Sequence, residues 1–368
     1  MQNLKLEEKL NLISRVSEEI LTPQDLEKLF SSKKKLRHYI GFEISGKIHL
    51  GTGLATMMVV KALQDIGVEC ILFLADWHTW INNKLGGNRE VIKKVAVGYF
   101  KEGLKASLKC VGGDPEKVKF VLGSELYHNN DEYWATFVRV CKELTLSRVK
   151  KSLSIAGRQA GEEVEFGLLL YPPLQVTDIF GLRVDIAHGG MDQRKAHVLA
   201  REVGEKVAGY KPVAIHNHIL LGLGKPPVWP VPKERLREVW ISMKMSKSQP
   251  NTCIFIHDTP EEIRQKINGA FCPPKEVEFN PVLDWTKHLI FPLRGKIMVK
   301  REKRFGGDIE YQSFQKLEED YKTEALHPQD LKNAVAEALI EILAPARKHF
   351  SSGKPKEMLE ELERIISK

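Results

Sequence analysis

The chain has 368 residues, of which 42% are hydrophobic and 28% are charged, and its 56 Lys plus Arg residues outnumber its 48 Asp plus Glu residues. At roughly 100–200 residues per domain this length corresponds to about two or three domains, and the hydrophobic share excludes a disordered chain. No apolar run approaches the roughly 18–20 residues of a membrane span, and the first residues lack the apolar core of a signal peptide. We therefore expect a cytoplasmic protein with no membrane partner, whose net charge of +8 is compatible with a polyanionic partner.

The cysteines do not form a recognisable cross-linked or metal-binding pattern. There are five, widely separated and without a CxxC pair: Cys70, Cys110, Cys141, Cys253 and Cys272. An odd, scattered set argues against a disulfide scaffold and a zinc knuckle, and it favours a reducing cytosol. The stretch His216-Asn217-His218 is better explained as the end of a strand than as a set of metal ligands. The sequence therefore predicts no protein-bound structural metal.

The first 32 residues are charged and amphipathic, and we expect an N-terminal helical segment there. An apolar strand (39–44), a helix (50–65) and a second strand (68–75) follow. The second strand is an unbroken apolar run, which is typical of a parallel strand buried on both faces. The order strand, helix, strand predicts a βαβ unit.

The same alternation continues along the chain. Further helices are expected at about 88–110, 131–157, 162–180 and 192–207, and further strands at 118–122, 184–187 and 212–215. This pattern predicts an α/β fold with a Rossmann-like parallel sheet over residues 33–256, including a Pro-rich insert at 224–240. Apolar residues then recur with a period of 3.6 over 331–343, so we expect a smaller, mainly helical C-terminal domain over 257–368.

A glycine-rich segment from Ser45 to Gly53 leads from the first strand of this sheet into its first helix. Ligands of open α/β sheets bind beyond the carboxyl ends of the strands, and a helix N-terminus with nearby glycines receives an anion well. His49 adds a hydrogen-bond donor at the same place. The segment matches neither a Walker loop nor a Rossmann fingerprint. Taken alone, it is better explained by a turn with an incidental histidine.

A second segment, from Met243 to Pro250, carries Lys244 and Lys247 three residues apart with serines beside them. Such a loop before a proline could hold phosphate groups. As a bare cluster of charges, however, it is better explained by a solvated surface loop.

Together the two segments resemble the signature pair of class I aminoacyl-tRNA synthetases, HxGx at the first helix and KMSKS about two hundred residues later. The resemblance extends to tyrosyl-tRNA synthetases of the archaeal and eukaryotic kind through the stretches 39–51, 75–78, 171–178 and 189–195. It covers about residues 35–350 in the right order, and it implies a synthetase catalytic domain followed by an anticodon-binding domain. The fourth position of the first motif is Thr52, where many members carry histidine, which leaves open whether one phosphate contact is kept.

The resemblance implies a pocket for tyrosine in which Tyr39 and Asp178 hydrogen-bond the phenol. Asp178 also stands out by itself, because an unpaired carboxylate in the largely apolar stretch 168–180 would be costly. Phenylalanine would leave both polar groups unpaired, which is the basis of its known rejection by this family. The other positions matched to the pocket are Tyr171, Gln175 and Gln193, which hold the α-amino group, and Glu43 and His78, which line it.

Activation of an amino acid needs no general base, because the attacking carboxylate is already ionised. The catalytic work is therefore positioning and the stabilisation of charge on the phosphates. The resemblance assigns this work to His49, Lys244 and Lys247, with ATP as co-substrate and Mg²⁺ bound to the ATP. The remaining positions matched to ATP binding are Gly41, Gly51, Met245, Ser246 and Ser248.

The second half-reaction implied by the family transfers the tyrosyl group to the 3′-terminal ribose of tRNA(Tyr). Arg194 and Lys195 match positions that meet the acceptor end, and a solvated helix start is the alternative for both. Phe305, His327 and Asp330 resemble an anticodon-reading site, where an unpaired base stacks on a ring and bonds to a carboxylate. For His327 the alternative is a plain helix N-terminus. The family further implies a homodimer.

Other functions fit the sequence less well. A tryptophanyl-tRNA synthetase shares the fold and the loops, but an indole offers only an N–H donor and suits Tyr39 and Asp178 poorly. A small nucleotidyltransferase of the same superfamily would have no need of the C-terminal helical domain. A non-catalytic RNA-binding paralogue would require damage to His49 or to residues 244–248, and both are intact apart from Thr52. The sequence thus favours a tyrosine–tRNA ligase.

Overall fold

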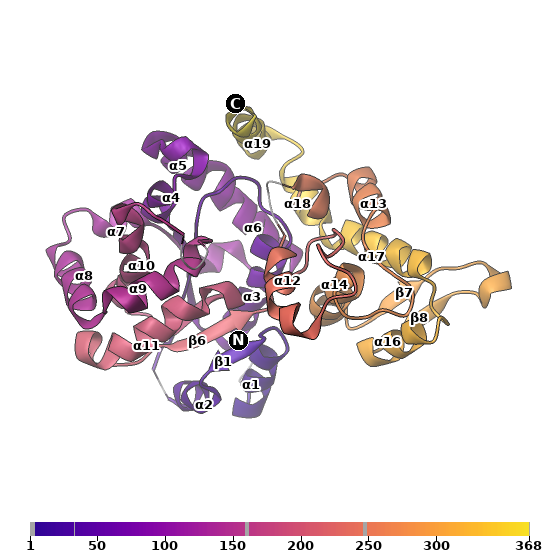
Figure 1. Ribbon diagram of the computed structural model, residues 1–368, viewed down its shortest axis with the longest axis horizontal. Helices are drawn as coiled ribbons and strands as arrows, with labels where there is room; N and C mark the ends of the chain where they lie inside the picture. The colour runs from indigo at the N-terminus through magenta and orange to yellow at the C-terminus, as the bar shows by residue number, and fades with distance from the viewer. Residues whose placement is uncertain (1–3, 33, 159–161, 246–248, 368) are drawn as a thin grey trace.

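The structure is a computed structural model that describes residues 4–32, 34–158, 162–245 and 249–367 of the chain. Within them a six-stranded sheet forms the centre of one half of the molecule (Figure 1). Its order is β1-β6-β5-β2-β3-β4, with β1 Glu19–Leu21, β2 Arg37–Phe42, β3 Glu69–Leu74, β4 Val118–Leu122, β5 Ile186–Gly190 and β6 Val213–Asn217. β2 to β6 are parallel, which confirms the predicted α/β fold with its Rossmann-like sheet.

The chain reverses its direction of travel across the sheet between β2 and β5. From β2 it proceeds outward to β3 and β4, and it then returns to the other side of β2 to lay down β5 and β6. The first crossover begins as a π-helical turn, η1 Gly51–Ala55, and continues as α3 Thr56–Ile66, which ends at Gly67 in the left-handed region with φ 91°. Open α/β sheets bind ligands at such a reversal point, beyond the carboxyl ends of the strands.

Not every predicted helix of the first half is continuous in the structure. The predicted helix over 131–157 is in fact α8 Asp131–Glu143, α9 Leu146–Ser152 and a 3₁₀ turn. The break has a local cause, because the Thr145 side chain accepts a hydrogen bond from the Arg148 N–H and so starts a new helix. The other helices of this half are α4 Asp76–Ile81, α5 Arg89–Val95, α6 Lys101–Cys110, α7 Gly123–Tyr127, α10 Tyr171–Gly181 and α11 Arg194–Ala208.

The N-terminal segment is not purely helical, contrary to the prediction. Between α1 Leu6–Ser14 and α2 Pro23–Ser31 lies β1, which pairs antiparallel with β6 and extends the sheet at its edge. Glu19 stands opposite His216 in this register. A strand of three residues is too short for an alternating pattern to appear in the sequence.

The C-terminal half is mainly helical, as predicted, but it also contains a two-stranded hairpin, β7 Ile297–Val299 and β8 Ile309–Tyr311, that was not predicted. The hairpin loop projects from the end of the molecule (Figure 1). α12 Leu236–Ser242 begins within the Pro-rich insert and ends two residues beyond its predicted boundary at 240. The remaining helices are α13 Pro260–Asn268, α14 Pro281–Trp285, α15 Phe291–Arg294, α16 Phe314–Lys322, α17 Pro328–Ile342, α18 Ala344–His349 and α19 Gly353–Ile366, with the π-turn η10 Thr286–Ile290 after α14.

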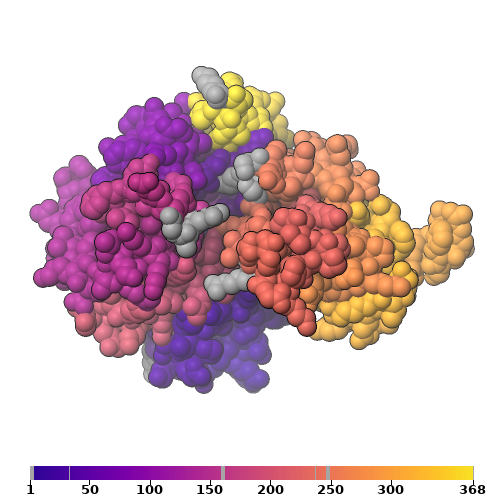
Figure 2. Space-filling view, viewed as in Figure 1, coloured from indigo at the N-terminus to yellow at the C-terminus, as the bar shows by residue number. Residues whose placement is uncertain are grey.

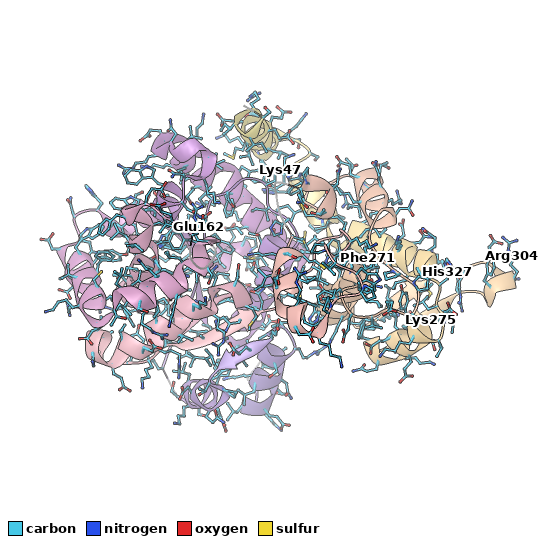
Figure 3. All side chains as sticks on the ribbon, in the orientation of Figure 1. Lys47, Glu162, Phe271, Lys275, Arg304 and His327 are labelled. Carbon is cyan, nitrogen blue, oxygen red and sulfur yellow. The ribbon has the colours of Figure 1, made fainter. Side chains whose placement is uncertain are left out.

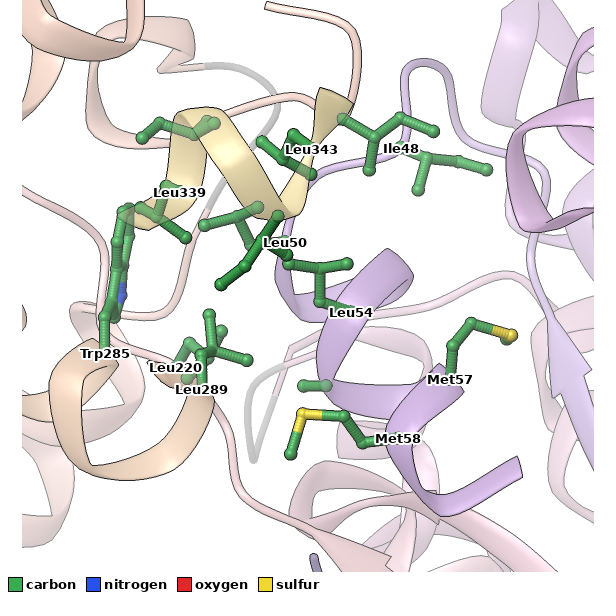
Figure 4. Close-up of a cluster of buried hydrophobic side chains, with 14 of the residues drawn as sticks. Ile48, Leu50, Leu54, Met57, Met58, Leu220, Trp285, Leu289, Leu339 and Leu343 are labelled. Atoms are coloured by element: carbon green, nitrogen blue, oxygen red, sulfur yellow. The ribbon is translucent and has the colours of Figure 1, made fainter. Parts of the chain in front are cut away.

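One hydrophobic core runs across the predicted boundary at residue 256. Leu50 and Leu54 at the start of the first crossover belong to the same buried cluster as Trp285, Leu339 and Leu343 of the C-terminal half (Figure 4). The two halves therefore share one hydrophobic core.

The last helix returns to the first half of the chain. In Figure 2, α19 forms a yellow ridge against the purple surface of the α5 region, apart from most of the orange and yellow half. Its Glu363 binds Lys47 at 2.5 Å, and its Glu361 pairs with Lys94. Among the described residues, no helix has both the length and the apolar character needed to cross a membrane.

Candidate active site

A cavity of about 550 Å³ opens at the reversal point of the sheet. Its walls come from the segments that follow β2, β3, β5 and β6, from α10, and from the residues just before position 246. The predicted residues that line it are Tyr39, Gly41, Glu43, His49, Gly51, His78, Tyr171, Gln175, Gln193, Lys244 and Met245. Residues more than two hundred positions apart in the sequence thus meet at the reversal point, where open α/β sheets bind their ligands.

The inner end of the cavity is built around Asp178, which is fully buried next to the lining residues Tyr39 and His78. Its Oδ1 accepts hydrogen bonds from the hydroxyls of Tyr127 (2.9 Å) and Tyr133 (2.7 Å). Its Oδ2 has no hydrogen-bond partner in the described part of the chain, and the nearest cationic candidate, His78 Nε2, is 3.7 Å away. A buried carboxylate oxygen of this kind is suited to accept a hydrogen bond from a ligand hydroxyl.

Burial sets the ionisation of this end of the cavity. It raises the pKa of Asp178 well above its usual range, although hydrogen bonds from Tyr133 and Tyr127 oppose the rise. It raises the pKa of Tyr39 as well, with the nearby charge of Asp178 as a second cause. It lowers the pKa of His78 to about 3, so the imidazole is neutral. A ligand that donates a hydrogen bond to Asp178 would favour the carboxylate form.

Gly41 has a role that the family resemblance did not suggest. A Cβ at this position would lie 2.5 Å from the hydroxyl oxygen of Tyr39, well inside van der Waals contact. Glycine at position 41 therefore leaves the space that the Tyr39 side chain occupies.

Polar side chains next to the inner end of the cavity are connected by hydrogen bonds. The Tyr171 hydroxyl donates to Glu43 Oε2 (3.1 Å), and Asn82 Nδ2 donates to the same oxygen (2.9 Å). Gln175 Nε2 donates to Gln193 Oε1 (3.2 Å), while Gln175 Oε1 has no partner among the residues described. Several oxygens that can accept from a ligand cation thus lie on one wall.

The first signature segment is folded around His49, which is 7% exposed. Its Nδ1 accepts hydrogen bonds from the backbone N–H groups of Gly51 (3.1 Å) and Thr52 (3.4 Å), which leaves the proton on Nε2. The Thr52 hydroxyl lies 3.3 Å from that Nε2. Thr52 therefore adds a hydroxyl at the position where many family members carry a second imidazole.

The chain just after the second signature segment pairs with the first segment through the backbone. Leu50 N donates to the Ile254 carbonyl and Ile256 N donates to the Ile48 carbonyl, both at 3.0 Å, so 48–50 and 254–256 form a short ladder. On the other side of the loop, Lys244 forms a bridge with Leu221. The ladder and the bridge thus fix the chain on the two sides of the second signature segment next to the cavity.

The Lys244 side chain lies at the cavity rim, where its ammonium group binds Asp192. Met245 is buried beside it. Ser246, Lys247 and Ser248, which were predicted to bind ATP, lie outside the described residues.

His218, just beyond the end of β6, also lines the cavity. The end of β6 at Asn217 confirms that His216 and Asn217 close a strand. Burial alone would lower the pKa of His218, but its hydrogen bonds to Asp284 and Glu18, both 2.8 Å, raise it to about 9.

The two groups predicted to contact tRNA lie in different halves. Arg194 Nε binds both carboxylate oxygens of Glu19 in β1 (2.9 and 2.8 Å), and Lys195 Nζ donates to the Lys151 carbonyl (2.7 Å). These contacts are compatible with the simpler explanation that both residues belong to a solvated helix start. The sequence offered no means of locating the partner Glu19, because the strand that carries it was not recognised.

The proposed anticodon residues are in the C-terminal half, at the end of the molecule where His327 and Arg304 are labelled in Figure 3. Phe305 is 59% exposed in the hairpin loop, with the Arg304 guanidinium 4.7 Å from its ring centre. His327 caps α17, where its Nδ1 accepts from the Gln329 N–H (3.1 Å), and Asp330 lies in the first turn of the same helix.

Sequence reasoning missed Tyr127, Tyr133 and Asn82. The two tyrosines belong to α7 and α8 and reach Asp178 from about fifty positions away. Asn82 follows α4 and links Glu43 to the Ala156 carbonyl. The available signal was the need of a buried carboxylate for donors, which names the type of partner but not its position.

Comparisons with known proteins agree with this geometry. Residues 31–344 match the family model described as tRNA synthetases class I (W and Y). A tyrosine–tRNA ligase from Thermococcus sibiricus is 52% identical over 359 residues, with 94% of this chain and 96% of that protein covered.

Solved structures show the same likeness. The crystal structure of a tyrosyl-tRNA synthetase complexed with L-tyrosine from Pyrococcus horikoshii is 50% identical with a TM-score of 0.93, covering 97% of this chain and 100% of that chain. The tyrosyl-tRNA synthetase from Aeropyrum pernix is 40% identical with a TM-score of 0.83, covering 98% of this chain and 100% of that one.

Proposed function

The chain belongs to the tyrosyl-tRNA synthetases, the tyrosine–tRNA ligases of class I, and we propose that it forms tyrosyl-adenylate and then tyrosyl-tRNA(Tyr) at the cavity described above. The observation that carries the assignment of the site is the Asp178 carboxylate. It is fully buried, it receives two tyrosine hydroxyls on one oxygen, and its other oxygen has no partner within the described ranges.

The tyrosine phenol donates a hydrogen bond to Asp178 Oδ2 and meets the Tyr39 hydroxyl. This assignment is supported by the fixed orientation of the carboxylate, because Tyr127 and Tyr133 occupy the Oδ1 side. Phenylalanine would bury the same polar groups without a partner, and the cost of the unpaired groups excludes it. An indole N–H cannot accept a hydrogen bond from Tyr39, so tryptophan fits less well.

The α-amino group of tyrosine binds to the polar wall, where Tyr171, Gln175 and Gln193 receive it. The free Oε1 of Gln175 supports this role, since an ammonium group needs acceptors. Glu43 and His78 line the pocket and hold these groups in place, Glu43 by its hydrogen bonds from Tyr171 and Asn82 and His78 by its position against Asp178.

ATP binds at the outer part of the cavity with Mg²⁺ on its phosphates. The tyrosine carboxylate, which is already ionised, attacks the α-phosphorus and expels pyrophosphate. His49, with its proton on Nε2, and Lys244 stabilise the charge that develops, together with Lys247 of the loop. The other groups assigned to ATP are Gly41, Gly51, Met245, Ser246 and Ser248.

The tyrosyl group then passes to the 3′-terminal ribose of tRNA(Tyr). Arg194 and Lys195 guide the acceptor end, and Phe305, His327 and Asp330 read the anticodon from a C-terminal domain that begins near residue 257. The exposed Phe305 ring supports this arrangement, since single-stranded RNA is commonly read by stacking. We further propose that the enzyme is a cytoplasmic homodimer.

The test is ATP–pyrophosphate exchange with each of the twenty amino acids, first without tRNA. Exchange with tyrosine alone is the expected result. Exchange with tryptophan would contradict the assignment of Asp178, and absence of exchange with and without tRNA would contradict the assignment of the cavity.

A further inference from the structure

A cluster of three possible metal ligands lies at the edge of the cavity, outside the groups assigned to tyrosine and ATP. It consists of His218 after β6, Asp284 in α14 and His288 in η10. Asp284 and His288 are four residues apart on one continuous helical stretch, so their side chains project from the same face. In the sequence, 66 positions separate His218 from Asp284, which is why no ligand spacing was visible.

The ligand atoms are close enough for one small cation. His218 Nε2 is 2.8 Å from Asp284 Oδ1, His288 Nε2 is 3.9 Å from the same oxygen, and all three atoms lie within 4.8 Å of one another. A tetrahedral Zn²⁺ with bonds of about 2.0–2.1 Å places its ligand atoms about 3.3 Å apart. The two imidazole rings are stacked, with centres 3.7 Å apart and planes inclined by 12°, so the His288 ring must turn for both nitrogen lone pairs to point at one ion.

His218 and Asp284 each form a further hydrogen bond on the side away from the cluster, as metal ligands in proteins usually do. Glu18 Oε2 binds His218 Nδ1 at 2.8 Å, which directs Nε2 toward Asp284. Asp284 Oδ2 accepts the Leu221 N–H at 3.0 Å, which leaves Oδ1 for the cluster. A carboxylate behind a ligating histidine fixes the tautomer and the orientation of the ring.

We propose that His218, Asp284 and His288 bind one divalent cation of the Zn²⁺ class. Two imidazoles and one carboxylate suit zinc and its neighbours, whereas Mg²⁺ prefers oxygen ligands, so this ion is distinct from the Mg²⁺ that accompanies ATP. The ion takes the place of the proton between His218 Nε2 and Asp284 Oδ1. His288 is partly exposed and His218 lines the cavity, so the fourth position is open to water.

The ion would connect three parts of the chain. Glu18 belongs to the N-terminal segment, His218 to the end of the central sheet, and Asp284 with His288 to the C-terminal half. We infer that the bound ion stabilises the junction of these parts beside the cavity.

The experiment uses the full chain without an added histidine tag, stripped of metal by a chelator. Zn²⁺ is titrated by calorimetry, and Co²⁺ is titrated in parallel so that visible absorption reports its coordination. We expect one equivalent per chain with a Kd below about 100 µM, a rise of the melting temperature on binding, and no competition by millimolar Mg²⁺. Absence of saturable binding below that concentration would overturn the proposal.

Three variants assign the binding to these residues. His288→Ala removes a ligand that is not part of the tyrosine or ATP site, and it should weaken Zn²⁺ binding at least tenfold. Glu18→Gln, which keeps the shape of the side chain behind His218, should weaken binding about tenfold as well. His128→Ala removes an exposed histidine elsewhere and should leave the Kd unchanged. Equal affinity in His288→Ala and His128→Ala would show that the ion binds elsewhere and would overturn the site.

Discussion

Two regions of this molecule are assigned to recognition, and they are built in opposite ways. The phenol end of the cavity contains a carboxylate with no exposed surface, fixed by two further tyrosines. The hairpin loop of the C-terminal half carries a phenylalanine that is 59% exposed, with the Arg304 guanidinium 4.7 Å from its ring centre. The first suits a small ligand that differs from its competitor by one hydroxyl, because a buried unpaired group is costly. The second suits a flexible polymer that brings its own stacking surface.

The largest effect is expected at the buried end. Asp178→Ala should lower kcat/KM for tyrosine in the exchange assay by about 100-fold or more, because a hydrogen bond to a charged group is lost. The Michaelis constant for ATP should stay within about twofold. An unchanged Michaelis constant for tyrosine in a folded variant would remove Asp178 from the pocket.

At the exposed end, Phe305→Ala should lower the rate of tRNA charging at subsaturating tRNA by about tenfold, which is the loss of one base stacked on an aromatic ring. Tyrosine-dependent exchange should not change, because the residue is remote from the cavity. Met298→Ala, at a 43% exposed apolar residue of the same hairpin, is the matched control and should charge tRNA normally. If exchange and charging fell together, the two regions would not be independent.

The buried end can also be perturbed without touching a polar group. Gly41→Ala would place a methyl group against the Tyr39 hydroxyl, and the Michaelis constant for tyrosine should rise by about tenfold as that hydroxyl is displaced. Gly167→Ala is the control, because a Cβ there meets no heavy atom within 4 Å. Similar kinetics in the two variants would mean that the position of Tyr39 is not important for binding.

The smallest effect should come from the tyrosine hydroxyls that orient the Asp178 carboxylate. Tyr133→Phe removes one of two hydroxyls on Asp178 Oδ1, so kcat/KM for tyrosine should fall by only about threefold to tenfold. Tyr210→Phe offers a comparison, because that buried hydroxyl has no hydrogen-bond partner among the described residues. A loss in Tyr133→Phe as large as in Asp178→Ala would mean that Tyr127 alone cannot orient the carboxylate.

The parts of the fold that could be predicted are those with a strong one-dimensional pattern. The buried parallel strand β3 is a continuous apolar run, and it was found within one residue of each end, whereas the predicted end of β5 at 187 falls three residues short of Gly190. β1, β7 and β8 have three residues each, and nothing in their sequence separates them from loops. The break between α8 and α9 depends on a single capping threonine inside a helical pattern.

The residues of the site likewise fall into those that the sequence identified and those that it did not. Its motif residues were identified through the family resemblance, and the structure gathers the described ones around one cavity. The supporting residues Tyr127, Tyr133 and Asn82 were not found, because their position depends on how α4, α7 and α8 pack and not on any spacing along the chain. Asp178 was assigned through the resemblance, and it also stood out by itself, since an apolar stretch tolerates a carboxylate only when partners are supplied.

The core that crosses residue 256 bears on how this enzyme can be divided or recombined. A fragment that stopped there would keep residues 254–256, the backbone partner of residues 48–50, but it would expose Leu50 and Leu54, which share a core with Trp285 and Leu339. The segment that carries His49 thus depends on residues of the C-terminal half for its shape. Exchanging that half for one from a different relative would therefore alter the walls of the cavity near His49, unless the residues packed at the junction were transferred with it.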